Sequence, residues 1–347
     1  MQLKIDKKLE KIPFYIETEI YELISGQPKN IVITTHINPD GDAIGSILAL
    51  YFFLKDIGHK VNMICPNNFP DFLSWMPESE KIIIFSHNHH KCIDLINSAD
   101  IIFNCDYNDI NRLESFSKYL KNAKAKHVVI DHHPDFYEYT KYKVYKTDVS
   151  AAAELVYEFI TNCPFYNNIT NEMATCIYVG MMTDSVEFSK NMKKRSFEIL
   201  AHLSSLQINI EQIHNNVYDN YSFDRMRFLG LALYKKMKII PECNTAYIYL
   251  SIDEQKKYNY QIGDTEGFVN FPLSIKGIKI SVLFIEKKDH IKISFRSKGN
   301  FSVNEFARKY YNGGGHKNAA GGKSFTSLKN TLIQFNKLIK QNIDNLK

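Results

Sequence analysis

Short apolar runs alternate with amphipathic stretches through the first half of the chain. The runs, bounded by polar and turn-forming residues, predict buried strands, and the stretches between them, where apolar residues recur at helical spacing, predict helices. Strands are expected at 30–35, 60–65, 82–85, 100–105 and 126–130, and helices at 7–25, 42–57, 109–122 and 150–162. Strands that alternate with helices in this way predict the parallel sheet of an α/β domain.

The pattern changes in the second half of the chain. Residues 170–240 read as almost continuous helix without an obvious strand, and after Pro241 the apolar runs become strand-like again. Strands are expected at 244–250, 278–285 and 290–296, the last two as a hairpin. The predicted fold class is therefore α/β in three parts: a parallel-sheet domain over 1–205, a helical connector over 206–240 and a smaller α/β domain over 241–347.

Composition and charge narrow the classes of protein. With 347 residues and 44% hydrophobic content the chain can bury a large core. Its net charge of +5 is well short of a strongly basic duplex-binding surface, but it suits a small anionic substrate. The six cysteines form no CxxC pair, so neither a disulfide framework nor a thiolate zinc site is indicated. No apolar run is long enough for a membrane span, and the charged N-terminus is unlike a signal peptide. We expect a soluble cytoplasmic protein.

Acidic and imidazole side chains follow the predicted strands of the first domain and, at Asp184, the end of an apolar helical stretch. The set comprises His36, Asp40, Asp42, Asp106, Asp131, His132, His133 and Asp184. In an open parallel sheet ligands gather at the carboxyl ends of the strands, so these side chains are expected at one edge. Converging aspartates would repel one another without cations, and a pair of divalent ions is the simplest resolution. Oxygen ligands with a few imidazoles and no thiolate suit manganese, or magnesium, better than structural zinc.

Each motif also has a simpler interpretation when it is taken alone. The first could be a polar loop with a helix cap at Asp42, the Asp-His-His triplet a solvated turn before Pro134, and Asp184 an ordinary exposed acid. Their common order along the chain favours a metal centre over these readings. The histidine-rich stretch Ser86–His90 lacks a carboxylate partner at ligand spacing, so we predict a solvated loop there.

Taken together, the motifs resemble those of the DHH phosphoesterase superfamily. The similar stretches are His36-Ile-Asn-Pro-Asp40-Gly-Asp42, Asn104-Cys-Asp106, Asp131-His-His133 and Thr183-Asp184. The later Gly313-Gly-Gly-His316-Lys-Asn-Ala-Ala-Gly-Gly322 resembles the glycine-rich signature of the DHH-associated C-terminal domain. Within the superfamily the chain most resembles the bifunctional oligoribonuclease and PAP phosphatase group. Five motifs in the right order, over nearly the whole chain, make the resemblance specific.

The resemblance implies a role for each of these residues. One Mn(II) ion would be held by His36, Asp40 and Asp106, and a second by Asp42, Asp106, His132 and Asp184, with Mg(II) as the other candidate metal. Asp106 would then bridge the two ions. Asp131 would orient an imidazole and His133 would contact the phosphoryl oxygens, so that Asp106, Asp131 and His133 are the expected catalytic residues.

The second domain is expected to bind the substrate. Three glycines, Gly313, Gly314 and Gly315, would let backbone N–H groups approach an anion, and His316 would add a hydrogen bond. Arg296 would make a forked contact to a terminal phosphate. The simpler alternatives are a flexible glycine loop and a surface arginine.

Two stretches depart from the family pattern. Ser185-Val186-Glu187 follows Asp184, where the family usually has a threonine and a small residue, and it adds a carboxylate near the predicted site. Ser150-Ala-Ala-Ala-Glu154 has alanines where the family more often has hydroxyl residues, so the resemblance implies the loss of a substrate contact there. Neither departure removes a predicted metal ligand.

The expected activity is manganese-dependent hydrolysis of phosphate esters, with short oligonucleotides (nanoRNA) and adenosine 3′,5′-bisphosphate as substrates. Hydrolysis of cyclic di-AMP or linear pApA by the same chemistry is the close alternative, and a nucleotide-binding sensor without catalysis is the alternative from another class. We expect no stable duplex binding and no membrane association, and a homodimer is left open.

Overall fold

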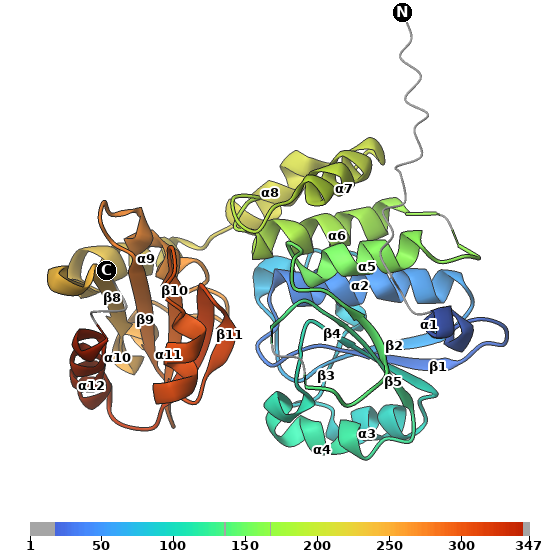
Figure 1. The fold of residues 1–347 in the computed structure, drawn as a ribbon, viewed down its shortest axis with the longest axis horizontal. Coiled ribbons are helices and arrows are strands. Elements are labelled where there is room, and N and C mark those ends of the chain that lie inside the picture. The colour runs from blue at the N-terminus through green and yellow to red at the C-terminus, as the bar shows by residue number, and fades with distance from the viewer. Residues whose placement is uncertain (1–17, 135–136, 167, 343–347) are drawn as a thin grey trace, which may run out of the picture. The chain divides into compact units, whose positions relative to one another are not determined.

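The computed structural model describes residues 18–134, 137–166 and 168–342. The chain divides into two compact units, Met1–Asn220 and Tyr221–Lys347. This division lies inside the segment 206–240 that the sequence assigns to a connector. The predicted helix at 7–25 lies partly outside the described residues; within them α1 spans Thr18–Leu23 (Figure 1).

The first unit is built on a six-stranded sheet in which every neighbouring pair is parallel, in the order β3-β2-β1-β4-β5-β6. Its strands are β1 (Asn30–Thr34), β2 (Lys60–Cys65), β3 (Ile83–Ile84), β4 (Ile101–Cys105), β5 (Lys126–Asp131) and β6 (Tyr142–Tyr145). The strand order reverses between β1 and β4, which is where parallel sheets open a crevice at their carboxyl ends. The predicted α/β class with a parallel first sheet is confirmed.

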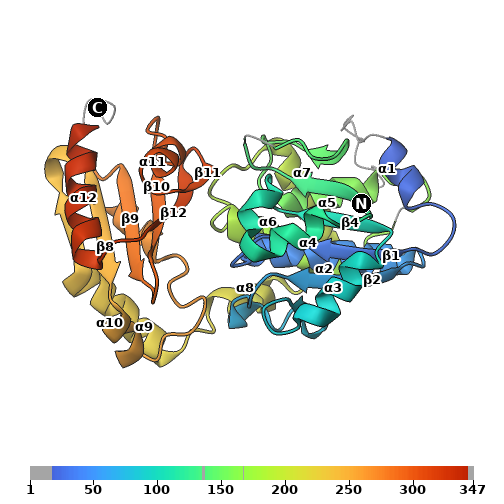
Figure 2. The ribbon, with the colours of Figure 1, turned by 90° about the horizontal axis from the view of Figure 1, so that it is seen from below.

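Helices cover both faces of this sheet (Figures 1 and 2). They are α2 (Gly41–Asp56), α3 (His89–Asn97), α4 (Ser117–Lys121), α5 (Ala152–Thr161) and α6 (Asn171–Asp184), and α7 (Lys194–Ser205) and α8 (Ile210–Tyr218) lie outside the layer of α5 and α6. Alternate residues of β1 point to opposite faces: Ile31 and Ile33 pack in the core with α2, α5 and α6, whereas Val32 packs with α3 and α4. A strand buried on both sides explains why its sequence is apolar without alternation.

Helices α2 and α6 pack closely because glycines lie at their contact. A β-carbon on Gly45 would lie 2.4 Å from the backbone oxygen of Cys176, and one on Gly41 would lie 2.4 Å from the Thr183 hydroxyl. A β-carbon on Gly180 would lie 2.5 Å from the Ala153 side chain and 3.1 Å from an oxygen of Asp42. Glycine is therefore required at these positions for α5 and α6 to approach the start of α2.

The structure corrects the sequence analysis of the first unit at three places. The stretch Ser86–His90 is exposed, as expected, but it is a loop only up to Asn88, because α3 begins at His89 and buries Cys92 and Ile96, one turn apart. The helix expected at 109–122 is a kinked 3₁₀ segment, Ile110–Phe116, followed by α4. Strand β6 was not expected, since its burial is mostly partial and its apolar pattern is weak.

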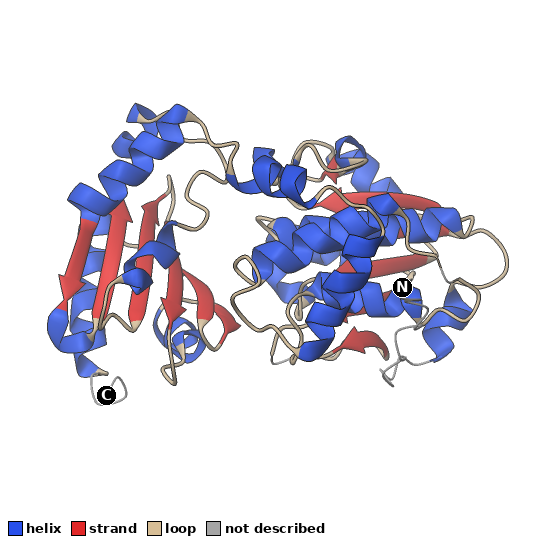
Figure 3. Cartoon of the chain, turned by 90° about the horizontal axis from the view of Figure 1, so that it is seen from above, coloured by secondary structure: helices blue, strands red, loops and turns tan. Residues whose placement is uncertain are grey.

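The second unit contains a mixed six-stranded sheet in the order β11-β12-β10-β9-β8-β7. Figure 3 shows its strands in red. Its strands are β7 (Met237–Ile240), β8 (Thr245–Leu250), β9 (Ile280–Glu286), β10 (Ile291–Ser297), β11 (Gly314–His316) and β12 (Ala319–Ser324), with helices α9 (Phe223–Leu231), α10 (Ile252–Lys257), α11 (Val303–Tyr310) and α12 (Leu328–Gln341). Strands β9 and β10 form the predicted antiparallel hairpin, and β8 pairs with β9 in parallel. Because β7 is a strand, the expectation of helix up to residue 240 was wrong at its end.

The two faces of this second sheet contribute to separate cores. On β9, Phe284 packs with α11 and α12, whereas the neighbouring Leu283 packs with α9. Among the residues that the structure describes, no helix has both the length and the apolar character that crossing a bilayer requires.

The close contact of α2 and α6 gives a prediction about stability. We expect Gly45→Ala to lower the free energy of unfolding by about 1–3 kcal/mol, because the added methyl group meets a helix backbone that cannot move aside locally. The matched control is Gly230→Ala in α9, where no described atom lies within 4 Å of the new methyl group. Gly230→Ala should raise the free energy of unfolding by about 0.5–1 kcal/mol, because alanine loses less backbone entropy than glycine on folding. Urea unfolding followed by circular dichroism measures both; a neutral Gly45→Ala would contradict the packing.

Candidate metal centre

All eight side chains predicted for the first unit lie together at the carboxyl ends of β1, β4 and β5. His36 follows β1, Asp106 follows β4, and Asp131 is the last residue of β5. Potential ligand atoms lie within 4.8 Å of one another in three groups: His36, Asp40 and Asp106; Asp42, His132 and Asp184; and Asp106, Asp131 and His133. These groups thus meet at the carboxyl ends of β1 and β4, where the strand order reverses.

Asp106 lies at the centre of the groups and is only 2% exposed. Its Oδ2 is 3.3 Å from Nε2 of His36, and its Oδ1 is 3.5 Å from Nε2 of His132 and 3.6 Å from Nδ1 of His133. Oδ1 is a buried atom without a hydrogen-bond partner among the described residues. The backbone of Asp106 has φ of +63°, a left-handed conformation that few residues other than glycine adopt and that is concentrated at functional sites.

Asp40 forms the N-cap of α2. Its Oδ1 accepts the N–H groups of Asp42 and Ala43, each at 3.1 Å, and lies 3.8 Å from Nε2 of His36. The helix cap that the sequence suggested at Asp42 therefore exists, but it is supplied by Asp40. This cap fixes the first turn of α2, and Asp42 lies in that turn.

Asp42 accepts hydrogen bonds from the first turn of another helix. Its Oδ2 accepts the N–H of Ala152 at 2.6 Å, and its Oδ1 accepts the N–H of Ala153 at 2.8 Å and the hydroxyl of Ser46 at 3.3 Å. The sequence gave no signal for this contact, because backbone N–H groups belong to every residue type except proline. Alanine at 152 and 153 is therefore compatible with this contact, which needs only backbone donors.

Asp131 holds the His133 side chain in place. Its Oδ1 lies 2.8 Å from Nδ1 of His133, and its Oδ2 accepts the backbone N–H of the same residue at 3.1 Å. Asp131 is fully buried. A buried carboxylate bound to Nδ1 fixes the ring orientation and leaves Nε2 as the nitrogen that would reach a ligand.

The extra carboxylate after Asp184 is not part of the gathered groups. Glu187 is exposed, and it belongs to none of the clusters found among the described residues. Val186, Glu187 and Phe188 have φ of +52°, +54° and +61°, so the chain makes a left-handed turn directly after α6. Glu187 therefore lies in solvent, apart from the gathered groups.

The charges of the site depend on one another. Burial alone would lower the pKa of His132, but the nearby carboxylates of Asp106, Asp184 and Asp42 raise it to about 10. Burial, followed by the charges of Asp106 and Asp184, raises the pKa of Asp42 well above its usual range. Without a cation, imidazole protons must offset the carboxylates. A divalent cation would offset the same charge more fully, and the oxygen-rich donor set fits one.

A thiolate ligand does not fit this arrangement. Cys105, next to Asp106, is buried, and burial together with the charge of Asp106 raises the pKa of its thiol well above the usual range. The thiol therefore stays protonated and is a poor metal ligand. The donor set excludes a zinc site of the cysteine type here.

In the second unit the glycine run is an ordered edge strand. Gly314–His316 forms β11, which pairs antiparallel with β12. The Gly313 N–H donates to the Ala307 oxygen at 3.2 Å and so is not directed at a ligand. A β-carbon on Gly313 would lie 2.0 Å from the Gly321 oxygen, so close backbone packing requires glycine there. Gly315 has φ of +145°, a conformation open chiefly to glycine. The flexible-loop alternative was wrong.

Arg296 and His316 are brought into register by the same sheet. Both pair with Ala319, on either side of strand β12, so their side chains leave the same face with a small residue between them. The neighbouring Phe295 is buried in the core with α11, so Arg296 points away from that core. The geometry places a guanidinium and an imidazole on one surface of the second unit.

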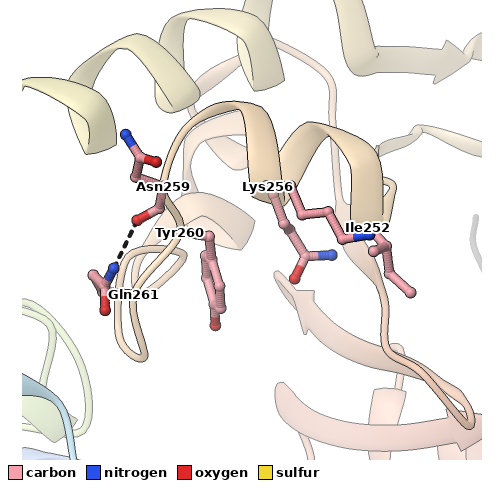
Figure 4. Close-up of a pocket in the computed structure, with 6 residues that line it drawn as sticks. Ile252, Lys256, Asn259, Tyr260 and Gln261 are labelled. Carbon is pink, nitrogen blue, oxygen red and sulfur yellow. Dashed lines mark hydrogen bonds between the residues drawn. The ribbon is translucent and has the colours of Figure 1, made fainter.

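A separate hollow of about 320 Å³ lies at α10 and the loop after it (Figure 4). It is lined by Ile252, Gln255, Lys256, Asn259, Tyr260 and Gln261. Gln261 Nε2 donates to the Asn259 oxygen at 2.9 Å and so closes the loop. None of the residues predicted to bind substrate lines this pocket.

Two family models match the chain, one in each of its two units. Residues 30–181 match the model of the DHH family, N-terminal domain, and residues 244–345 match the model of the DHHA1 domain. The chain belongs to the DHH family. The predicted family is confirmed, and with it the class of enzyme, a hydrolase of phosphate esters.

Relatives resemble the DHH chain over most of its length. The bifunctional oligoribonuclease and PAP phosphatase NrnA of Bacillus subtilis is 25% identical over 317 residues, which are 90% of this chain and 94% of that protein. The crystal structure of an exopolyphosphatase-related protein from Bacteroides fragilis is 37% identical with a TM-score of 0.89, over 95% of this chain and 96% of that one. RecJ of Thermus thermophilus, solved with Mn²⁺, is 14% identical with a TM-score of 0.58, over 99% of this chain and 56% of that one, and shows the fold alone.

The gathered carboxylates give a prediction about metal and stability. Because a cation that binds only the folded state stabilises it by mass action, Mn(II) at 100 times its dissociation constant should add about 2.7 kcal/mol to the free energy of unfolding. The measurement compares melting temperatures in EDTA and in manganese. Asp106→Asn should remove most of the shift, whereas Asp94→Asn, on the exposed side of α3, should keep it. Equal melting temperatures with and without manganese would contradict a metal centre.

Proposed function

We propose that this protein is a manganese-dependent phosphoesterase that hydrolyses short oligoribonucleotides and adenosine 3′,5′-bisphosphate. The observation that carries the proposal is the placement of Asp106, whose two oxygens face different histidines, His36 on one side and His132 on the other. A buried carboxylate with one oxygen toward each group of ligands is suited to bridge two cations. The relative named oligoribonuclease and PAP phosphatase supports the choice of substrates.

The proposed ligands divide into two sets that share Asp106. The first set is His36, Asp40 and Asp106, and the second is Asp42, Asp106, His132 and Asp184. Divalent cations, when bound by these sets, supply charge neutralisation at phosphorus and a water of lowered pKa. Manganese is proposed because carboxylates with a minority of imidazoles match its preferences, with magnesium as the other candidate.

The remaining residues act on the substrate directly or position those that do. Asp131 would hold the His133 ring through Nδ1, so that Nε2 can donate a hydrogen bond to a phosphoryl oxygen as negative charge develops there. In the second unit Arg296, Gly313, Gly314, Gly315 and His316 would bind a remote part of the nucleotide. The common surface of Arg296 and His316, flanking Ala319, supports this role for an anion such as a second phosphate.

A panel of substrates tests the proposal. The protein, loaded with Mn(II), is assayed with a dinucleotide, longer RNA, adenosine 3′,5′-bisphosphate, cyclic di-AMP, linear pApA and pyrophosphate. We expect the highest kcat/KM for the dinucleotide and the bisphosphate. A preference for cyclic di-AMP or pyrophosphate would contradict the proposed substrates while keeping the chemistry, and inactivity on every ester would contradict the chemistry itself.

The bridging role of Asp106 gives a sharper prediction. Asp106→Ala should reduce turnover of every substrate at least 100-fold, roughly the loss expected when both cations and the nucleophile they share are misplaced. The control is Asp94→Ala, an exposed aspartate that belongs to none of the gathered groups. If Asp106→Ala kept a tenth of the activity, another residue would have to bridge the ions.

The division of work between the two units can also be tested. Arg296→Ala and His316→Ala should leave the manganese content unchanged but lower kcat/KM for the bisphosphate, because binding energy from remote groups positions the reacting phosphate. Bis(p-nitrophenyl) phosphate, a small activated ester, depends less on such contacts and should lose less activity. Elemental analysis and kinetics measure the two effects. Lost manganese, or an equal loss on all substrates, would show that these residues serve the metal centre or the fold.

A further inference from the structure

Glu154, on the first turn of α5, is a buried carboxylate that the proposed chemistry does not use. It is 2% exposed, and one of its oxygens, Oε2, accepts three hydrogen bonds. The donors are the Ser150 N–H at 3.0 Å, the Ser150 hydroxyl at 2.5 Å and the Ser196 hydroxyl of α7 at 2.8 Å. Because a buried carboxylate is costly to leave unpaired, this cluster strongly fixes the segments that supply its donors.

One of those segments is the turn that leads into α5. The same turn directs the N–H groups of Ala152 and Ala153 at the two oxygens of Asp42. The N-cap of α5 is Ala151, whose side chain cannot accept a hydrogen bond, so Asp42 from α2 satisfies donors that the helix leaves open. The orientation of Asp42 therefore depends on where the backbone of residues 150–153 lies.

We propose that Glu154 is a positioning residue of the metal centre: it fixes the turn at 150–153, and the N–H groups of that turn orient Asp42 toward His132 and Asp184. The inference rests on the proposed function, because it assigns Asp42 to a cation. Removal of groups that orient a metal ligand from outside typically weakens metal affinity by about 10- to 100-fold.

A neighbouring glutamate separates this role from simple support of the fold. Glu158, one turn later on α5, forms a forked pair with Arg195 of α7, at 2.6 and 3.2 Å. Arg195 and Ser196 are consecutive residues, so both glutamates tie α5 to the same turn of α7. Only Glu154 also bonds to Ser150 before the helix. Glu158 is therefore a matched control for the loss of an α5–α7 contact.

The experiment uses the full chain, stripped of metal with EDTA, and titrates Mn(II) by calorimetry while circular dichroism checks the fold. Glu154→Ala should weaken binding of at least one Mn(II) about 10-fold. Glu158→Ala should lower the melting temperature but keep each dissociation constant within about twofold of the wild type, as expected for a contact away from the ligands. Glu154→Gln should recover most of the affinity, since its amide oxygen can accept the same hydrogen bonds.

Each outcome decides between the alternatives. Unchanged affinity in folded Glu154→Ala, or an equal loss in Glu158→Ala, would overturn the positioning role and leave the proposed function standing. A wild-type protein that binds no manganese would overturn the proposed function and this inference with it. If Glu154→Ala does not fold, Ser150→Ala removes the hydroxyl that ties the turn before α5 to Glu154 and should weaken binding about threefold, a part of the effect of losing the whole group. An unchanged affinity there would overturn the inference.

Discussion

Carboxylates repel one another, and the first unit buries several of them within a few ångströms of the same imidazoles. Asp42 and Asp106 are almost fully buried, and the ligand atoms around them lie within 4.8 Å of one another in overlapping groups. In an environment of low polarity such repulsion is strong, so the arrangement needs compensating positive charge. The raised pKa of His132 is one sign of that need. The rest of the unit holds these groups together against their repulsion.

The scaffold achieves this through backbone as much as through side chains. Glycines at the contact of α2 and α6 let two helices approach closely, and the open turn of α5 donates two N–H groups to Asp42. Asp40 caps the helix that carries Asp42, and Asp131 fixes His133. Asp42 and His133 are thus held in place by groups on neighbouring elements, as precise positioning of a metal or substrate requires.

The sequence predicted which acidic and imidazole side chains gather at one place, because a simple rule places most of them. Acidic and imidazole residues after apolar runs must lie at one edge of a parallel sheet, and Asp106, Asp131 and His132 follow that rule. The contact between Asp42 of α2 and the start of α5 could not be predicted, because its donors are backbone N–H groups, which every residue except proline has. Helix α3 was missed since the polar histidines at its start conceal the one-turn spacing of Cys92 and Ile96. The sequence leaves a flexible loop open as the alternative at the glycine run, because the pairing of β11 with β12 does not show in the local sequence.

The contact between Asp42 and Ala152 also changes how the start of α5 should be treated in protein engineering. Ala152 occupies the first helical position, where proline is statistically favoured and where designers often introduce it to stiffen a chain. Here the same proline would delete the N–H that lies 2.6 Å from Asp42. A substitution that general helix rules recommend would therefore remove a hydrogen bond to the buried Asp42 carboxylate. Residue 152 should keep a backbone N–H group in any redesign.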